Sequence, residues 1–156
     1  MIKLAKSLVA NDNNELTLYM VIGLPGSGKS TYAKNLASKE GIKYFEADQY
    51  FEKDGEYYFD KRKLNDAHRW CQASVAKELN NGNSVIVSNT GLALWEREKY
   101  YQIAEYFNAK IKLKIMDGNF RNIHNVSDEV LENMKQKFEE NKVKPSEISK
   151  YNIEEI

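Results

Sequence analysis

The feature that most constrains this chain is a glycine-rich segment that follows a run of β-favouring residues. Residues 23–30 read GLPGSGKS and match the phosphate-binding pattern G-x-x-x-x-G-K-[ST] in full. Residues 16–22 favour a strand, residues 30–39 favour a helix, and Gly41 is suited to cap that helix. The segment therefore has the strand, loop and helix order that the pattern requires. We predict a loop that holds the phosphates of a nucleoside triphosphate.

The residue types in this loop each suit a separate chemical task. Gly26 and Gly28 tolerate unusual backbone angles and carry no Cβ, so backbone N–H groups can point at phosphate oxygens. The Lys29 side chain reaches the β- and γ-phosphates, and the Ser30 hydroxyl is a magnesium ligand. We expect ATP and Mg²⁺ as cofactors. The expected contacts come from Gly23, Leu24, Pro25, Gly26, Ser27, Gly28, Lys29, Ser30 and Thr31.

Beyond the loop, strand-like and helical segments alternate. Short strands are predicted at residues 42–46, 84–88 and 109–116, and the apolar run of the second is typical of a strand covered on both faces. Such alternation predicts a three-layer α/β domain with a mostly parallel sheet and its ligand site at the carboxyl ends of the strands.

Three further helices are predicted between and after these strands. The first begins at Asp60 and carries an apolar stripe, the second spans about residues 94–107, and the third begins after an N-cap at Ser127. The stripe of the first helix is Leu64, Ala67, Cys71, Val75 and Leu79; the residues expected to be buried in the third are Val130, Leu131, Met134 and Phe138.

Length and composition favour one continuous domain over residues 1–156. No linker or repeat interrupts the chain, and we expect a lead-in at 1–15, a core at 16–141 and a tail at 142–156. The 23 basic and 23 acidic side chains balance, so no global field draws the protein to nucleic acid or to a membrane. Cys71 is the only cysteine, which excludes an internal disulfide and suits a cytoplasmic location.

Several motifs together resemble the polynucleotide-kinase-like family of P-loop kinases. They are GLPGSGKST, EADQYF, EYYFD with LNDAH, NGNSVIVSNT and RNIHNVS, and they extend the resemblance from about residue 18 to residue 140. The resemblance implies a P-loop NTPase fold and transfer of the γ-phosphate of ATP to a hydroxyl. It assigns Asp48 as the general base and Arg121 as the cation of a lid over the triphosphate.

The chain departs from the family pattern in places that bear on catalysis. Many relatives carry an acid for magnesium where this chain has Ser88 or Asn89. Asn89, Thr90 and Asp117 remain candidates for contact with metal-bound water or the acceptor. Gly91 stands where asparagine is expected, and Phe51 stands where an arginine can bind the substrate phosphate.

Three functions remain open from the sequence. The first is a kinase for the 5′-hydroxyl of DNA or RNA, the second a kinase for a nucleoside or nucleotide, and the third an ATP-binding module with a degenerate metal site. Aromatic residues follow Asp48 and could either stack on an acceptor base or pack beneath the loop. They are Tyr50, Phe51, Tyr57, Tyr58 and Phe59.

Overall fold

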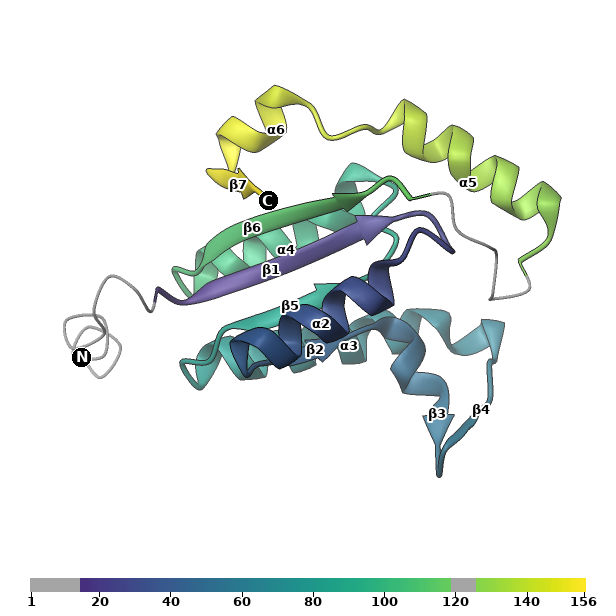
Figure 1. Ribbon diagram of the computed structural model, residues 1–156, viewed down its shortest axis with the longest axis horizontal. Helices are drawn as coiled ribbons and strands as arrows, with labels where there is room; N and C mark the ends of the chain where they lie inside the picture. The colour runs from purple at the N-terminus through teal and green to yellow at the C-terminus, as the bar shows by residue number, and fades with distance from the viewer. Residues whose placement is uncertain (1–14, 119–125) are drawn as a thin grey trace.

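The computed structural model describes residues 15–118 and 126–156. Its centre is a five-stranded sheet in which every neighbouring pair of strands is parallel, in the order β2-β5-β1-β6-β7 (Figure 1). The strands are β1 (Thr17–Gly23), β2 (Lys43–Phe45), β5 (Val85–Ser88), β6 (Lys110–Met116) and β7 (Ile153–Glu155). Because all five run the same way, their carboxyl ends meet at one edge.

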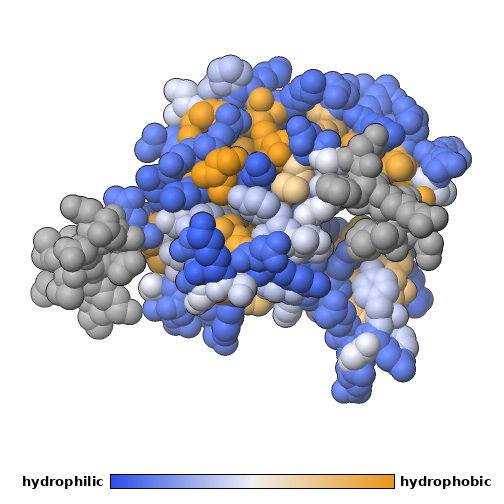
Figure 2. Space-filling model, in the orientation of Figure 1, coloured by the Kyte–Doolittle hydropathy of each residue, from blue (hydrophilic) through white to orange (hydrophobic). Residues whose placement is uncertain are grey.

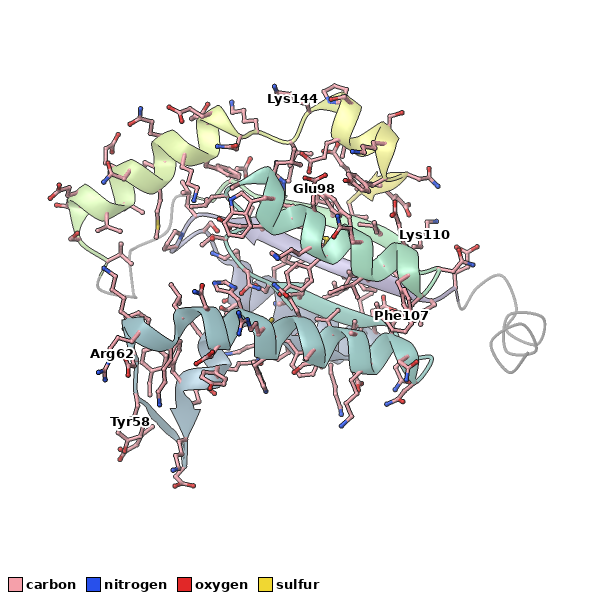
Figure 3. The ribbon with its side chains drawn as sticks, turned by 180° about the vertical axis from the view of Figure 1, so that it is seen from behind. Tyr58, Arg62, Glu98, Phe107, Lys110 and Lys144 are labelled. Atoms are coloured by element: carbon pink, nitrogen blue, oxygen red, sulfur yellow. The ribbon has the colours of Figure 1, made fainter. Side chains whose placement is uncertain are left out.

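Helices cover both faces of this sheet. Helix α2 (Lys29–Glu40) lies on one face, and α3 (Leu64–Asn80) and α4 (Leu94–Tyr106) lie on the other (Figures 1 and 3). The predicted three-layer α/β architecture is confirmed. The remaining elements are the 3-10 helices η2 (Ala47–Phe51) and η3 (Lys61–Lys63), the hairpin of β3 (Glu52–Lys53) and β4 (Glu56–Tyr57), α5 (Asp128–Glu140) and α6 (Pro145–Lys150).

Strand β5 shows why an unbroken apolar run belongs at the centre of a parallel sheet. It pairs with β2 on one side and β1 on the other, and all of its residues are buried. Val85 and Val87 pack in the larger core cluster on the α3 and α4 face, whereas Ile86 packs with Val21 and Ala33 on the α2 face. Alternate residues point to opposite faces, so both faces need apolar side chains.

The apolar stripe of α3 is buried except at its first residue: Leu64 is exposed, whereas Ala67, Cys71, Val75 and Leu79 are buried. The predicted burial of residues in α5 is wrong. No residue of α5 is fully buried, and Val130 is 44% exposed. Helical spacing identifies a common face, but how far that face is covered depends on what packs against it. The N-cap is confirmed, because the Ser127 side chain accepts a hydrogen bond from Val130 N.

The C-terminal segment after residue 141, which the sequence analysis treats as a tail, contributes a strand to the sheet. Strand β7 pairs with β6, with Ile153 opposite Ile111, and the backbone N–H of Ile156 donates to the carbonyl of Leu113. Ile153 is buried in the main cluster. An edge strand presents unpaired backbone groups, and β7 satisfies those of β6.

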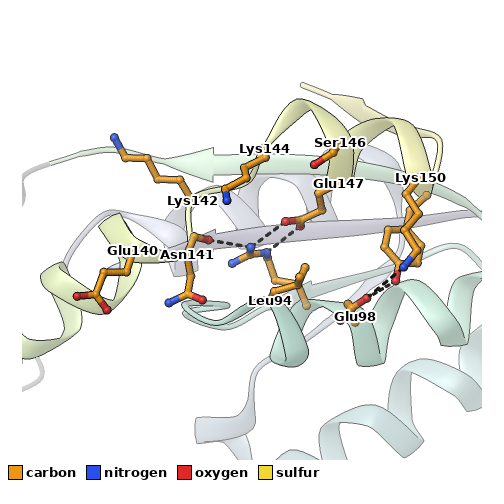
Figure 4. Close-up of a pocket in the computed structure, with 11 residues that line it drawn as sticks. Leu94, Glu98, Glu140, Asn141, Lys142, Lys144, Ser146, Glu147 and Lys150 are labelled. Carbon is orange, nitrogen blue, oxygen red and sulfur yellow. Dashed lines mark hydrogen bonds and ion pairs between the residues drawn. The ribbon is translucent and has the colours of Figure 1, made fainter.

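A buried ion pair joins α4 to this segment (Figure 4). The Arg97 guanidinium donates to both carboxylate oxygens of Glu147, from Nε at 2.9 Å and from Nη2 at 2.8 Å. It also donates to the carbonyls of Gly91 and Asn141, each at 2.8 Å, and Tyr101 donates its hydroxyl to Glu147. All the donors of this cluster thus find acceptors across three segments, and the sequence pattern gave no indication of it.

The surface seen in Figure 2 is mostly hydrophilic over α2, and hydrophobic residues gather over β6 and the C-terminal elements. None of the helices within residues 15–118 and 126–156 combines the length and apolar character needed to cross a lipid bilayer.

Glu147→Ala is expected to lower the free energy of unfolding by about 3–5 kcal/mol, because it leaves the buried Arg97 charge without its partner. Urea titration followed by circular dichroism measures this loss. Glu139→Ala is the matched control, because Glu139 forms an ion pair with Lys142 in which both side chains are exposed. It should cost roughly 0–1 kcal/mol. Equal losses in both variants would contradict a structural role for the buried pair.

Candidate functional site

The phosphate-binding loop joins β1 to α2 at the carboxyl edge of the sheet. Gly26 and Gly28 have φ angles of 78° and 93°, in the region that side chains disfavour. The N–H groups in the first turn of α2 have no partners within the helix, and the helix dipole places partial positive charge there. The loop therefore presents donors and positive charge to one point, which is the arrangement an anion needs.

Gly23 allows the loop to lie close to its neighbours. A Cβ at this position would stand 2.7 Å from the carbonyl oxygen of Met116 and 2.8 Å from Ser27 Oγ. The N–H of Gly23 also donates to the Thr90 carbonyl at 3.1 Å. Any larger residue would push the start of the loop away from β6 and from the segment that follows β5.

Lys29 begins α2, and its side chain folds back over the loop. The Nζ atom donates to the carbonyl of Leu24 at 2.9 Å. Burial lowers the pKa of Lys29 to about 8, and the carboxylates of Glu46 and Asp48 act in the opposite direction, that of Glu46 more strongly. The ammonium group is therefore mostly protonated at neutral pH. Two acidic side chains from the β2 end lie within electrostatic range of it.

Asp48 lies in η2, directly after β2, and is exposed. The Tyr57 hydroxyl donates to Asp48 Oδ1 at 3.3 Å. Partial burial and the charge of Asp48 raise the pKa of Tyr57 to about 12, so the phenol remains a donor at neutral pH. Tyr57 therefore orients this carboxylate, a role that the sequence analysis did not assign to it.

Asn89 directs its side chain away from the phosphate loop. Its Oδ1 accepts from the backbone N–H of Ala47 at 3.0 Å, and its Nδ2 donates to the hydroxyl of Tyr100 and to the sulfur of Cys71. Asn89 thus holds the beginning of η2 in place. It reaches the site only indirectly, through the position of Asp48.

Three buried polar atoms have no hydrogen-bond partner among the described residues: Ser27 Oγ, Glu46 Oε1 and Ser88 Oγ. Ser27 belongs to the loop, and the other two follow or end strands at the same edge of the sheet. Buried polar atoms without partners are rare because each costs free energy. All three lie at the edge of the sheet that carries the phosphate loop, where they offer hydrogen-bonding atoms to a polar ligand.

The other candidates from the sequence lie near this edge with different surroundings. Thr90 contributes its backbone carbonyl to Gly23, and Asp117 is exposed after the end of β6. Gly91 has a φ of 57°, and a Cβ there would stand 2.6 Å from Ile22 Cγ2. This contact explains why asparagine is absent from position 91. Arg121 lies outside the described residues.

The residues fit magnesium as a nucleotide-bound ion better than as a free one. No group of three or more His, Cys, Asp or Glu side chains suited to a metal occurs within the described ranges. Mg²⁺ commonly keeps several waters and takes only one or two protein ligands beside the phosphates. Ser30, in the first turn of α2, would be such a ligand.

Comparison with known proteins identifies the family. Residues 18–119, about two thirds of the chain, match the family model described as AAA domain. The chain belongs to the AAA domain family. NEDD4-binding protein 2 of Homo sapiens is 32% identical over 136 residues, a match that covers 80% of this chain and only 8% of that protein.

Solved structures show the same fold at low sequence identity. Kti12 of Chaetomium thermophilum, in complex with ADP-AlF3, has a TM-score of 0.63 at 14% identity, with 89% of this chain and 88% of that chain covered. The Pnkp1/Rnl/Hen1 RNA repair complex gives 0.56 at 24% identity, with 90% and 44% covered. The APS kinase CysC of Mycobacterium tuberculosis gives 0.53 at 17% identity, with 80% and 98% covered. The fold is that of P-loop kinase-like, ATP-binding domains.

Lys29→Ala is expected to weaken ATP binding by roughly 10- to 100-fold, because a charged hydrogen bond contributes about 1.5–3 kcal/mol. Isothermal titration calorimetry measures the affinity. Lys34→Ala, on the exposed face of the same helix, is the control and should bind ATP as the wild type does. Unchanged affinity in Lys29→Ala would place the nucleotide elsewhere.

Proposed function

We propose that this chain is an ATP-dependent kinase that transfers the γ-phosphoryl group of ATP to the 5′-hydroxyl of a polynucleotide. The observation that carries the proposal is the juxtaposition of Lys29 and Asp48. The Asp48 carboxylate lies within electrostatic range of Lys29, where with Glu46 it partly offsets the lowering of the Lys29 pKa by burial, and it remains exposed to an incoming acceptor. A phosphate-binding loop beside an accessible carboxylate is the arrangement that phosphoryl transfer to a hydroxyl requires.

In the proposed reaction, these residues account for every bond and proton that changes. The acceptor oxygen forms a bond to the γ-phosphorus while the bond from that phosphorus to the β,γ-bridging oxygen breaks, so that ADP leaves. The acceptor proton passes to the Asp48 carboxylate, which Tyr57 orients. Lys29 and the N–H groups of the loop stabilise the phosphate charge. Ser30 would hold Mg²⁺, which when bound neutralises charge on the β- and γ-oxygens.

Aromatic side chains beside Asp48 support a nucleic acid as the acceptor. The rings of Tyr57 and Phe59 are stacked, with centroids 6.4 Å apart and planes 15° apart, and each side chain is 54% exposed. Phe51 packs edge-on against Phe59 from below and is buried. The cluster therefore divides into a buried base and an exposed pair of rings. Exposed rings of this kind stack nucleobases with little preference for sequence.

The comparison with solved structures is consistent with this acceptor without deciding it. One neighbour of similar fold is an RNA repair complex and another is the APS kinase CysC. A common fold hosts many acceptors, so the choice between them rests on the site.

The test is transfer of γ-labelled phosphate from ATP to 5′-hydroxyl DNA and RNA oligonucleotides, with nucleosides and nucleotides assayed in parallel. We expect label at oligonucleotide 5′ ends. Asp48→Asn should retain ATP affinity and lose about 10²- to 10⁴-fold in turnover, the contribution typical of general base catalysis. Label on small acceptors alone would replace the polynucleotide by a small molecule. ATP binding with no labelled acceptor would identify a non-catalytic ATP-binding module.

Phe59→Ala is expected to raise the KM for an oligonucleotide by roughly 5- to 100-fold, because stacking contributes about 1–3 kcal/mol per base. The KM for ATP should not change. Steady-state kinetics with each substrate varied in turn measures both constants. Tyr106→Ala, an exposed aromatic at the opposite end of the sheet, is the control. An unchanged oligonucleotide KM in Phe59→Ala would remove the ring from acceptor binding.

A further inference from the structure

The carboxylate missing from the end of β5 has a counterpart on the neighbouring strand. Strands β2 and β5 are parallel and paired in register, with Tyr44 opposite Ile86 and Phe45 opposite Val87. Continuing this register places Glu46 opposite Ser88, which with Asn89 is one of the two positions where the family resemblance leads us to expect an acid. Glu46 has extended backbone angles, with φ −132° and ψ 143°, so the alternation of the strand continues through it.

Both positions face the side of the sheet that carries the phosphate-binding helix. Tyr44 and Ile86, two residues earlier on each strand, pack in the cluster formed with Val21 and Ala33 beneath α2. Side chains at i and i+2 share a face of a strand, so Glu46 and Ser88 are directed toward the α2 layer. Asn89, one residue on, is directed to the opposite layer, where it contacts Tyr100 and Cys71.

The Glu46 side chain accepts from the backbone N–H of Gln49 in the capping box of η2, which leaves one carboxylate oxygen without a partner among the described residues. This oxygen, Oε1, is buried. The Lys29 ammonium donates its hydrogen bond to the carbonyl of Leu24. Burying a carboxylate oxygen without a partner is costly, and a bound cation with its waters removes that cost.

The two other acids at this edge are less suited to the same role. Asp48 is exposed and accepts from Tyr57, an arrangement that suits the acceptor side of the site. Asp117 is exposed after β6, on the far side of β1 from β2. Only Glu46 combines a buried unpartnered oxygen with a register position opposite Ser88.

We infer that Glu46 supplies the carboxylate that holds the magnesium ion of the nucleotide in this protein, in place of the acid that is missing at Ser88 or Asn89 after β5. The inference rests on the proposed use of Mg²⁺ with ATP. The metal-binding acid would then lie at the end of β2 instead of the neighbouring β5. Asp48 remains free to act as the base. The departure from the family pattern at Ser88 or Asn89 is then compensated within the same edge of the sheet.

The experiment compares metal binding in Glu46→Gln and wild type, with Asp48→Asn as the matched control. Manganese is titrated into each protein in the presence of ADP and followed by electron paramagnetic resonance. Calorimetry gives the affinity for the non-hydrolysable analogue AMPPNP in Mg²⁺ and in EDTA. Glu46→Gln should lower the Mn²⁺ affinity by about 10- to 100-fold, the range found when a group that supports a metal site is removed. Its affinity for AMPPNP in EDTA should stay at the wild-type value.

A second variant, Glu46→Gln with Ser88→Asp, returns a carboxylate to the β5 position and should regain part of the lost Mn²⁺ affinity. Wild-type Mn²⁺ affinity in Glu46→Gln would overturn the inference. An equal loss of AMPPNP affinity in EDTA would also overturn it, because the residue would then shape the loop and not the metal site. These readouts are independent of any acceptor, so a failure to label oligonucleotides would refute the proposed kinase and leave this result standing.

Discussion

The pairing of β1 with both β5 and β6 is the constraint on which the rest of the structure depends. β1 is hydrogen-bonded on both sides along parallel partners, with Val21 opposite Ser88 and Gly23 opposite Met116. This register brings the phosphate loop, the end of β5 and the end of β6 to one level. Gly23 permits the contact because a Cβ would collide with the Met116 carbonyl. Every residue proposed to act on the nucleotide is positioned from this edge.

The site is electrostatically incomplete by itself. Lys29 is a partly desolvated cation whose pKa is lowered to about 8, and the Glu46 carboxylate near it has a buried oxygen without a partner. The unpartnered hydroxyls of Ser27 and Ser88 lie at the same edge. A triphosphate with its metal ion carries negative charge for Lys29 and positive charge for Glu46. Ligand binding is therefore expected to relieve these costs, which is one basis of preorganised recognition.

On the α4 face of the sheet, buried charged groups find their hydrogen-bond partners within the protein. Arg97, buried in α4, finds acceptors on Glu147, Gly91 and Asn141, and Tyr101 completes the cluster. The contrast separates two uses of buried charge. A fully hydrogen-bonded group fixes the C-terminal segment against α4, whereas an incompletely satisfied group lies at the edge where we propose that the nucleotide binds. Gly91 links the two, because its carbonyl accepts from Arg97 and its lack of a Cβ lets it lie against Ile22 of β1.

The sequence by itself determined the phosphate loop, the alternation of strands and helices, and the three-layer architecture, because each is encoded by residues close together in the chain. Val85, Ile86 and Val87 revealed a central strand for the same local reason. Tertiary structure decided what depends on partners distant in sequence. Leu64 and Val130 have helical spacing but stay 39% and 44% exposed, and β7 joined the sheet because β6 offered an unpaired edge. Likewise Glu46 became a candidate ligand only through its register with Ser88, which lies 42 positions along the chain and one strand away.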